Sequence, residues 1–246
     1  MPATDIEIRL CCATVTVSLS LPPYAADLIS ATLRPATRHP KGITVTTKFS
    51  IVMTVFGSFE LLPRAMMNVC RQEYADWELL LVVDGPSPQG RFAPKTAVDQ
   101  LRRHFPDKRI DIWELPRAEG SHGNVGRRFA LDQAGGDYVC WVNHDNLIAP
   151  SYLAVHAANI EKTPGCLSVV DVDLWVGDRY HGVYPRRLAR SKIDLLCFAV
   201  PLATAKEVDA FGGTIAKVYA ADWTTFAACQ KILPIEHNHS VVGTHF

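Results

Sequence analysis

Residues 138–145 read Tyr138-Val139-Cys140-Trp141-Val142-Asn143-His144-Asp145, an apolar run followed at once by three polar residues. A run this short, bounded by turn-forming residues, is typical of a strand buried on both faces of a sheet. Gly135-Gly136 stands just before it, where glycine commonly ends a helix. The stretch therefore predicts a helix, a buried strand and then a polar turn at the edge of a sheet.

The same pattern repeats on both sides of this stretch. Further strands are predicted at Phe49–Val55, Glu78–Val83, Arg109–Leu115 and Cys166–Trp175. Amphipathic segments that predict helices lie at Glu60–Cys70, Pro94–His104, Val125–Gln133, Pro150–Glu161 and Ala221–Cys229. Short apolar strands alternating with longer amphipathic helices are typical of an α/β fold with a mostly parallel central sheet flanked by helices.

The first 48 residues differ from the rest, because they are rich in proline and small polar residues. Thr14–Leu21 alternates polar with apolar residues, as a strand does, until Pro22-Pro23 interrupts it. A short helix is expected near Ala25–Leu33. We predict a poorly ordered N-terminal extension at residues 1–48 and a globular domain at residues 49–246.

Composition excludes several classes of protein. The chain has 246 residues, and its 25 Lys and Arg residues balance 25 Asp and Glu residues, so its charge favours neither a nucleic-acid partner nor an anionic membrane. Seven scattered cysteines indicate buried thiols rather than a disulfide framework. The Leu10–Leu21 segment is too short and too polar for a transmembrane helix. We expect a cytoplasmic protein and leave peripheral membrane association open.

Polar residues follow three of the predicted strands. Thr54 and Phe56 stand at the end of the first strand, Asp84 at the end of the second, and Asn143 and Asp145 after residues 138–142. Ligands of open α/β sheets bind beyond the carboxyl ends of the strands. The sequence therefore predicts one binding site built from these three strand ends.

With these residues in place, the chain from Phe49 onward resembles a family 2 glycosyltransferase of the GT-A fold, over roughly four-fifths of its length. The likeness rests on Phe49–Gly57, on Gln72 with Trp77–Gly85, on Gly123–Gly126 with Gly135–Tyr138, on Asn143–Asp145 in the place of the DxD motif, and more loosely on Asp222. The resemblance implies transfer of one sugar, with inversion, from a nucleotide diphosphate sugar of the UDP or dTDP type to a saccharide or other hydroxyl acceptor. It also implies a divalent metal, Mn²⁺ or Mg²⁺.

The resemblance assigns the metal to Asp145. Hard divalent cations prefer oxygen ligands and neutralise the charge of a departing diphosphate. A structural role as a helix or turn cap is the alternative for this carboxylate. Asn143 departs from the family pattern, which usually has Asp there, because it can hydrogen-bond a ribose but brings no charge.

The donor's other contacts are expected at five residues. Asp84 would accept a hydrogen bond from uracil or thymine, with Thr54 beside it and Phe56 packed on the base. Asp84 before Gly85-Pro86 is also ordinary turn chemistry. His144 and Arg127 would touch the diphosphate or sugar. A solvated surface position is an equal alternative for Arg127, and an exposed turn position is the commoner case for His144.

Asp222 matches the position from which the family draws its catalytic base, and a helix cap is the alternative role. His237, His239 and His245 stand near the end of the sequence. The resemblance allows a late histidine at the metal, and we place His239 there, although a mobile tail is the more favoured reading. Two other functions stay open. One is a non-catalytic nucleotide-sugar-binding or scaffold protein, and the other is a nucleotidyltransferase, which the absence of Lys and Arg from Phe56–Glu60 disfavours.

Overall fold

The computed structural model describes two units of the chain, Met1–His39 and Pro40–Phe246. The described residues are 4–10, 13–19, 47–56, 59–85, 99, 101–185, 187–190, 192–213 and 220–246. In the first unit, β1 (Thr4–Leu10) pairs antiparallel with β2 (Ala13–Leu19). β2 overlaps the strand predicted at Thr14–Leu21, whereas its partner β1 was not predicted. The predicted helix at Ala25–Leu33 lies outside the described residues, and the boundary at residue 48 stays a prediction.

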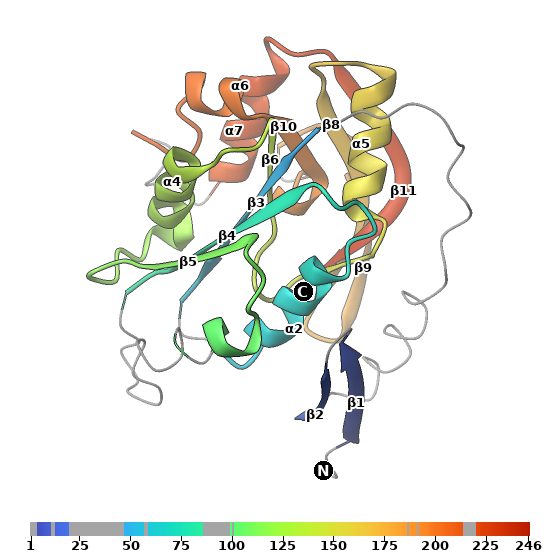
Figure 1. The fold of residues 1–246 in the computed structure, drawn as a ribbon. Coiled ribbons are helices and arrows are strands. Elements are labelled where there is room, and N and C mark those ends of the chain that lie inside the picture. The colour runs from blue at the N-terminus through green and yellow to red at the C-terminus, as the bar shows by residue number, and fades with distance from the viewer. Residues whose placement is uncertain are drawn as a thin grey trace. The chain divides into compact units, whose positions relative to one another are not determined.

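The second unit is built on a nine-stranded sheet in the order β5-β4-β3-β6-β10-β8-β11-β7, with β9 paired to β8 (Figure 1). Its strands are β3 (Phe49–Val55), β4 (Trp77–Val83), β5 (Ile110–Glu114), β6 (Tyr138–Trp141), β7 (Leu147–Ile148), β8 (Leu167–Val176), β9 (Arg179–Tyr184), β10 (Phe198–Pro201) and β11 (Ile235–His245). β3 runs parallel to both β4 and β6. The strand order therefore reverses at β3, which makes this the switch point where ligands bind.

Helices cover the sheet on both faces (Figure 1). They are α2 (Leu62–Cys70), α4 (Asn124–Gln133), α5 (Tyr152–Lys162), α6 (Leu202–Glu207) and α7 (Ala221–Gln230), with single 3₁₀ turns at Ser121–Gly123 and Leu195–Cys197. α7 packs on one face through Phe226, whose ring lies 5.3 Å from that of Phe198. α5 packs on the other face, where His156 bonds to Ser168 of β8.

Most of the predicted elements are confirmed to within a few residues, and the mixed α/β sheet flanked by helices is the predicted fold class. The buried strands fit best, because their continuous apolar runs are read directly from sequence: β3 has the predicted bounds, and all its residues are buried. Of the predicted helix at Pro94–His104, only residues 99 and 101–104 are described, and they are helical.

The end of the chain corrects one expectation. The final histidines, His237, His239 and His245, do not lie in the predicted mobile tail but in the long strand β11. β11 runs parallel to β8 and antiparallel to β7. The sequence does not predict this strand, because many of its residues are polar. The hydrogen bonds that hold it come from its position between β8 and β7.

Candidate active site

The ends of β3, β4 and β6 bring the predicted donor residues to one edge of the sheet. Asp84 is 1% exposed, and its Oδ1 accepts a hydrogen bond of 2.8 Å from the backbone N–H of Glu119. This carboxylate thus ties the following loop to the end of β4. Phe56, in contrast, is 44% exposed at the end of β3.

Thr54 lies beneath the glycine loop that precedes α4. A Cβ added to Gly123 would come within 2.6 Å of Thr54 Oγ1, and one added to Gly126 within 3.0 Å of its Cγ2. Gly123 also has φ 78°, a left-handed conformation that glycine adopts without strain. The two glycines therefore let the loop and the first turn of α4 rest directly on β3.

Arg127, in the first turn of α4, is buried under this loop, with 7% of its surface exposed. Its Nη1 donates to the carbonyl of His122 at 2.8 Å and to Asn124 Oδ1 at 2.9 Å. Its Nη2 donates to Asn143 Oδ1 at 2.8 Å. The guanidinium is therefore fixed, and the amide of Asn143 is occupied in holding it.

Three carboxylates surround two cations at this edge. Burial lowers the pKa of Arg127 to about 10, while the negative charges of Asp222, Asp194 and Asp145 oppose that shift. The same three carboxylates act on His245, the last residue of β11, and together they raise its pKa even though burial works against the charged ring. With both cations charged, the five groups still carry a net charge of −1, so the cluster favours an additional cation.

Asp194 links the end of β11 to this cluster. Its Oδ2 lies 3.0 Å from Nδ1 of His245, and its Oδ1 accepts from the amide of Leu196 at 2.9 Å. Burial alone would raise the pKa of Asp194, but His245, the Leu196 amide and Arg127 lower it below its ordinary value. The sequence alone assigns no role to Asp194, because its partner His245 lies 51 positions further along the chain.

Asp222 lies in the first turn of α7, where the helix amides favour a negative charge. Burial and the neighbouring charge of Asp194 nevertheless raise the pKa of its carboxyl above the ordinary value, against the opposing effect of Arg127. A carboxylate with a raised pKa is a better proton acceptor than an exposed one. Asp222 therefore has the properties required of a general base.

Asp145 begins the turn between β6 and β7. Among the described residues its Oδ1 is buried and has no hydrogen-bond partner, while its backbone carbonyl accepts from Arg64 at 2.8 Å. An unpartnered buried carboxylate oxygen is costly unless a cation or a ligand satisfies it. His144 beside it points its Nδ1 toward the carbonyl of Thr54 at 3.3 Å, and burial lowers its pKa.

The structure separates the late histidines. His245 lies in the cluster with Asp145, whereas His239 lies beside Asp171 of β8, 3.2 Å from its Oδ2. Of the residues predicted from sequence, Arg127, Asn143, Asp145 and Asp222 thus come together, with Thr54 packed against the loop above Arg127. The metal role of His239 stays a prediction, and it concerns a different part of β11.

Comparison with curated proteins finds glycosyltransferases that match part of this chain. An uncharacterized glycosyltransferase of Haemophilus influenzae is 27% identical over 100 residues, which are 41% of this chain and 37% of that protein. The UDP-Glc:alpha-D-GlcNAc-diphosphoundecaprenol beta-1,3-glucosyltransferase of Escherichia coli is 29% identical over 98 residues, 40% of this chain and 35% of that protein. The chain thus matches only about a third of the length of these relatives.

Solved structures share this fold, and one of them is a mannosyltransferase. S. aureus TarS 1-349, in complex with UDP-GlcNAc, aligns with a TM-score of 0.66 and 16% identity over 80% of this chain and 58% of that one. The mannosyltransferase PcManGT of Pyrobaculum calidifontis, in complex with GDP-Man and Mn²⁺, aligns with a TM-score of 0.59 and 19% identity over 90% of this chain and 65% of that one. The model of the family described as glycosyl transferase family 2 matches residues 50–208. Since this match covers more than half of the chain, the protein belongs to glycosyl transferase family 2 and is a glycosyltransferase.

Proposed function

We propose that this glycosyltransferase transfers one sugar, with inversion, from a nucleotide diphosphate sugar to a hydroxyl acceptor in a metal-dependent reaction. The observation that carries the proposal is the cluster of Asp145, Asp194 and Asp222 around Arg127 and His245. In this cluster, Asp145 has a buried carboxylate oxygen without a hydrogen-bond partner among the described residues. Asp222 is a second carboxylate, and its pKa is raised. These are the two groups that such a transfer needs.

The divalent metal would be held by Asp145 and His245. Carboxylate oxygens suit Mn²⁺ or Mg²⁺, and the unsatisfied Oδ1 of Asp145 fits such an ion. We assign this role to His245 and not to the predicted His239, because His245 lies near Asp145 whereas His239 lies beside Asp171. The Nδ1 of His245 faces Asp194, which leaves Nε2 for a metal. When bound, the ion neutralises the charge that develops on the departing diphosphate.

The residues of the chain itself would orient the donor and remove a proton. Asp84 and exposed Phe56 flank the space after β3 and β4, where a UDP or dTDP base fits their chemistry. Arg127 is held too firmly to reach outward, so we assign it to fixing Asn143 and to balancing the carboxylates. Asp222 would accept the proton of the attacking hydroxyl, which a general base does with a gain of about 10²–10⁴ in rate.

A thermal-shift panel tests the donor site. UDP-, dTDP- and GDP-sugars are each added with and without Mn²⁺ to the wild-type chain and to Asp145→Asn. A donor at about 100 times its Kd should stabilise the protein by about 2.7 kcal/mol, and only with metal. Asp145→Asn should lose the metal-dependent part. A panel without any metal-dependent shift would refute the donor site, and binding without sugar transfer would favour a non-catalytic binding protein.

A further inference from the structure

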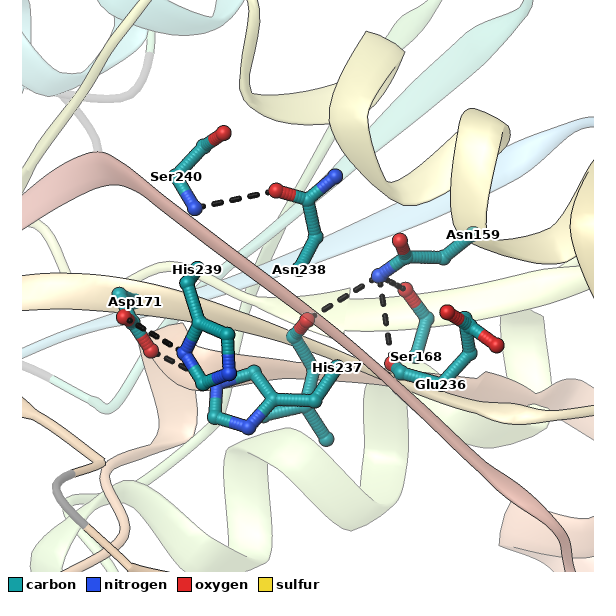
Figure 2. A network of polar contacts seen from close by, with 9 residues as sticks. Asn159, Ser168, Asp171, Glu236, His237, Asn238, His239 and Ser240 are labelled. Atoms are coloured by element: carbon teal, nitrogen blue, oxygen red, sulfur yellow. Dashed lines mark hydrogen bonds and ion pairs between the residues drawn. The ribbon is translucent and has the colours of Figure 1, made fainter.

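Asp171 of β8 and His237 and His239 of β11 form a second group of potential metal ligands (Figure 2). One donor atom of each residue lies within 4.8 Å of the other two. In the part of the chain that the structure describes, this is the one group of three such side chains that meets this condition. Asp171 pairs with Val241, whereas His245 pairs with Leu174, three residues further along β8. The group is therefore displaced by about 10 Å along the strand from His245.

An irregularity in β11 lies at this group. Asn238 pairs with Val170 and Val241 with Asp171, so two residues of β11, at positions 239 and 240, have no counterpart on β8. The amide of Ser240 donates instead to the side chain of Asn238 at 3.0 Å. Such bulges re-aim side chains and occur often beside functional sites. His237 and His239, two residues apart on β11, face the same carboxylate beside this bulge.

The two sides of β11 have different partners (Figure 2). On one side, Asn159 of α5 donates to Ser168 Oγ at 3.0 Å and to the carbonyl of Glu236 at 3.3 Å, which fixes the β8–β11 register. On the other side, His237 Nε2 lies 2.7 Å from Asp171 Oδ1, and His239 Nδ1 lies 3.2 Å from Oδ2. The three potential metal ligands thus belong to β8 and β11, and Asn159 holds these two strands in register from the opposite face.

The charges favour a cation between these side chains. The two imidazole rings are 4.0 Å apart, and the single carboxylate between them is only 7% exposed. Each ring turns one nitrogen toward this carboxylate, and imidazole nitrogens are common metal ligands. Zinc–nitrogen and zinc–oxygen bonds of about 2.0–2.1 Å put tetrahedral ligands about 3.3 Å apart. The 3.2 Å between His239 Nδ1 and Asp171 Oδ2 is close to this spacing, and His237 Nε2, at 2.7 Å from Oδ1, would move outward to admit the ion.

We propose that Asp171, His237 and His239 bind a borderline transition-metal ion, with Zn²⁺ as the best fit, in addition to the metal of the donor site. Imidazole ligands favour Zn²⁺ over Mg²⁺ or Mn²⁺. Three protein ligands leave a fourth position for water or another ligand. The side chain of His239 is 75% exposed, so this position opens toward solvent.

Zinc titration of the full chain tests the proposal. The protein carries no polyhistidine tag, is stripped with EDTA, and has the Asp145→Asn substitution so that the donor site does not contribute. Calorimetry with Zn²⁺ should give one site. His239→Gln should weaken it at least about 100-fold, beyond the 10–100-fold typical of losing an outer-shell partner. The matched control is His181→Gln, which changes an exposed histidine of β9 and should bind Zn²⁺ as its parent does.

A second measurement separates metal binding from loss of structure. Co²⁺ bound by two imidazoles and a carboxylate gives a visible absorption band, which Asp171→Asn and His239→Gln should both remove. The circular dichroism spectrum should stay that of the parent, because His239 is exposed. Equal Zn²⁺ affinity in the parent and in His239→Gln, or no binding at micromolar concentration, would show a purely hydrogen-bonded cluster and overturn the proposal. Neither readout depends on sugar transfer.

Discussion

Replacing the buried Arg127 by methionine should destabilise the protein more than the same replacement of its neighbour Arg128. Methionine retains much of the side-chain volume but removes three hydrogen bonds, to His122, Asn124 and Asn143. It also leaves the three carboxylates of the cluster without the cation buried among them. Removing one partner from a buried charged group costs about 3–5 kcal/mol. For a chain of this size that corresponds to a fall in Tm of about 6–20 °C.

Arg128 provides the matched control, since it is the next residue of the same helix. Its ion pairs with Asp132 and Asp209 are solvent-exposed, so Arg128→Met should cost at most about 1 kcal/mol. Urea denaturation followed by tryptophan fluorescence measures both variants. If their free energies of unfolding differ by less than about 1 kcal/mol, the buried cluster does not depend on Arg127 and the electrostatic reasoning fails.

Three further perturbations follow from other parts of the structure. Asp222→Asn should keep donor binding and lose about 10²–10⁴ in kcat. In the wild type, kcat/KM should fall as pH drops through a pKa above the ordinary range of an aspartate, and a profile flat down to pH 4 would contradict this. Gly123→Ala should lower Tm more than Gly120→Ala, because both glycines have positive φ but only the first would meet Thr54; equal losses would contradict the close approach. Burial would raise the pKa of Glu78, but its hydrogen bonds lower it, so its stabilisation is present above the ordinary pKa of about 4.3 and lost as pH falls below it. The stability difference between wild type and Glu78→Gln should therefore shrink in acid, and a difference independent of pH would refute that assignment.

The sequence predicted the parts of the fold that depend on local patterns. β3 and β4 are continuous apolar runs, and the polar residues that follow them mark the sheet edge without any tertiary information. The sequence accordingly predicts that Thr54, Asp84, Asn143 and Asp145 lie at one edge of the sheet. Among the described helices, none combines the length and the apolar character needed to cross a membrane.

The remaining features depend on contacts between distant residues. β11 contains Glu236, His237, Asn238 and His239 in succession, which no period of hydrophobicity identifies as a central strand. It forms because β8 and β7 supply hydrogen-bond partners on both sides. For the same reason, sequence could not choose between His239 and His245, because the choice depends on which carboxylate each histidine meets.

Because residues 239 and 240 of β11 have no counterpart on β8, the proposed zinc site could be removed while the strand pairing before it is kept. If residues 239 and 240 were excised, Asn238 and Val241 would become neighbours opposite Val170 and Asp171, which are already consecutive on β8. The pairing of β11 with β8 would then be regular as far as Val241, and His239 would be removed with the two residues. The same fold could thus be engineered without the proposed zinc site, so that the proposed sugar transfer is studied with the donor-site metal alone.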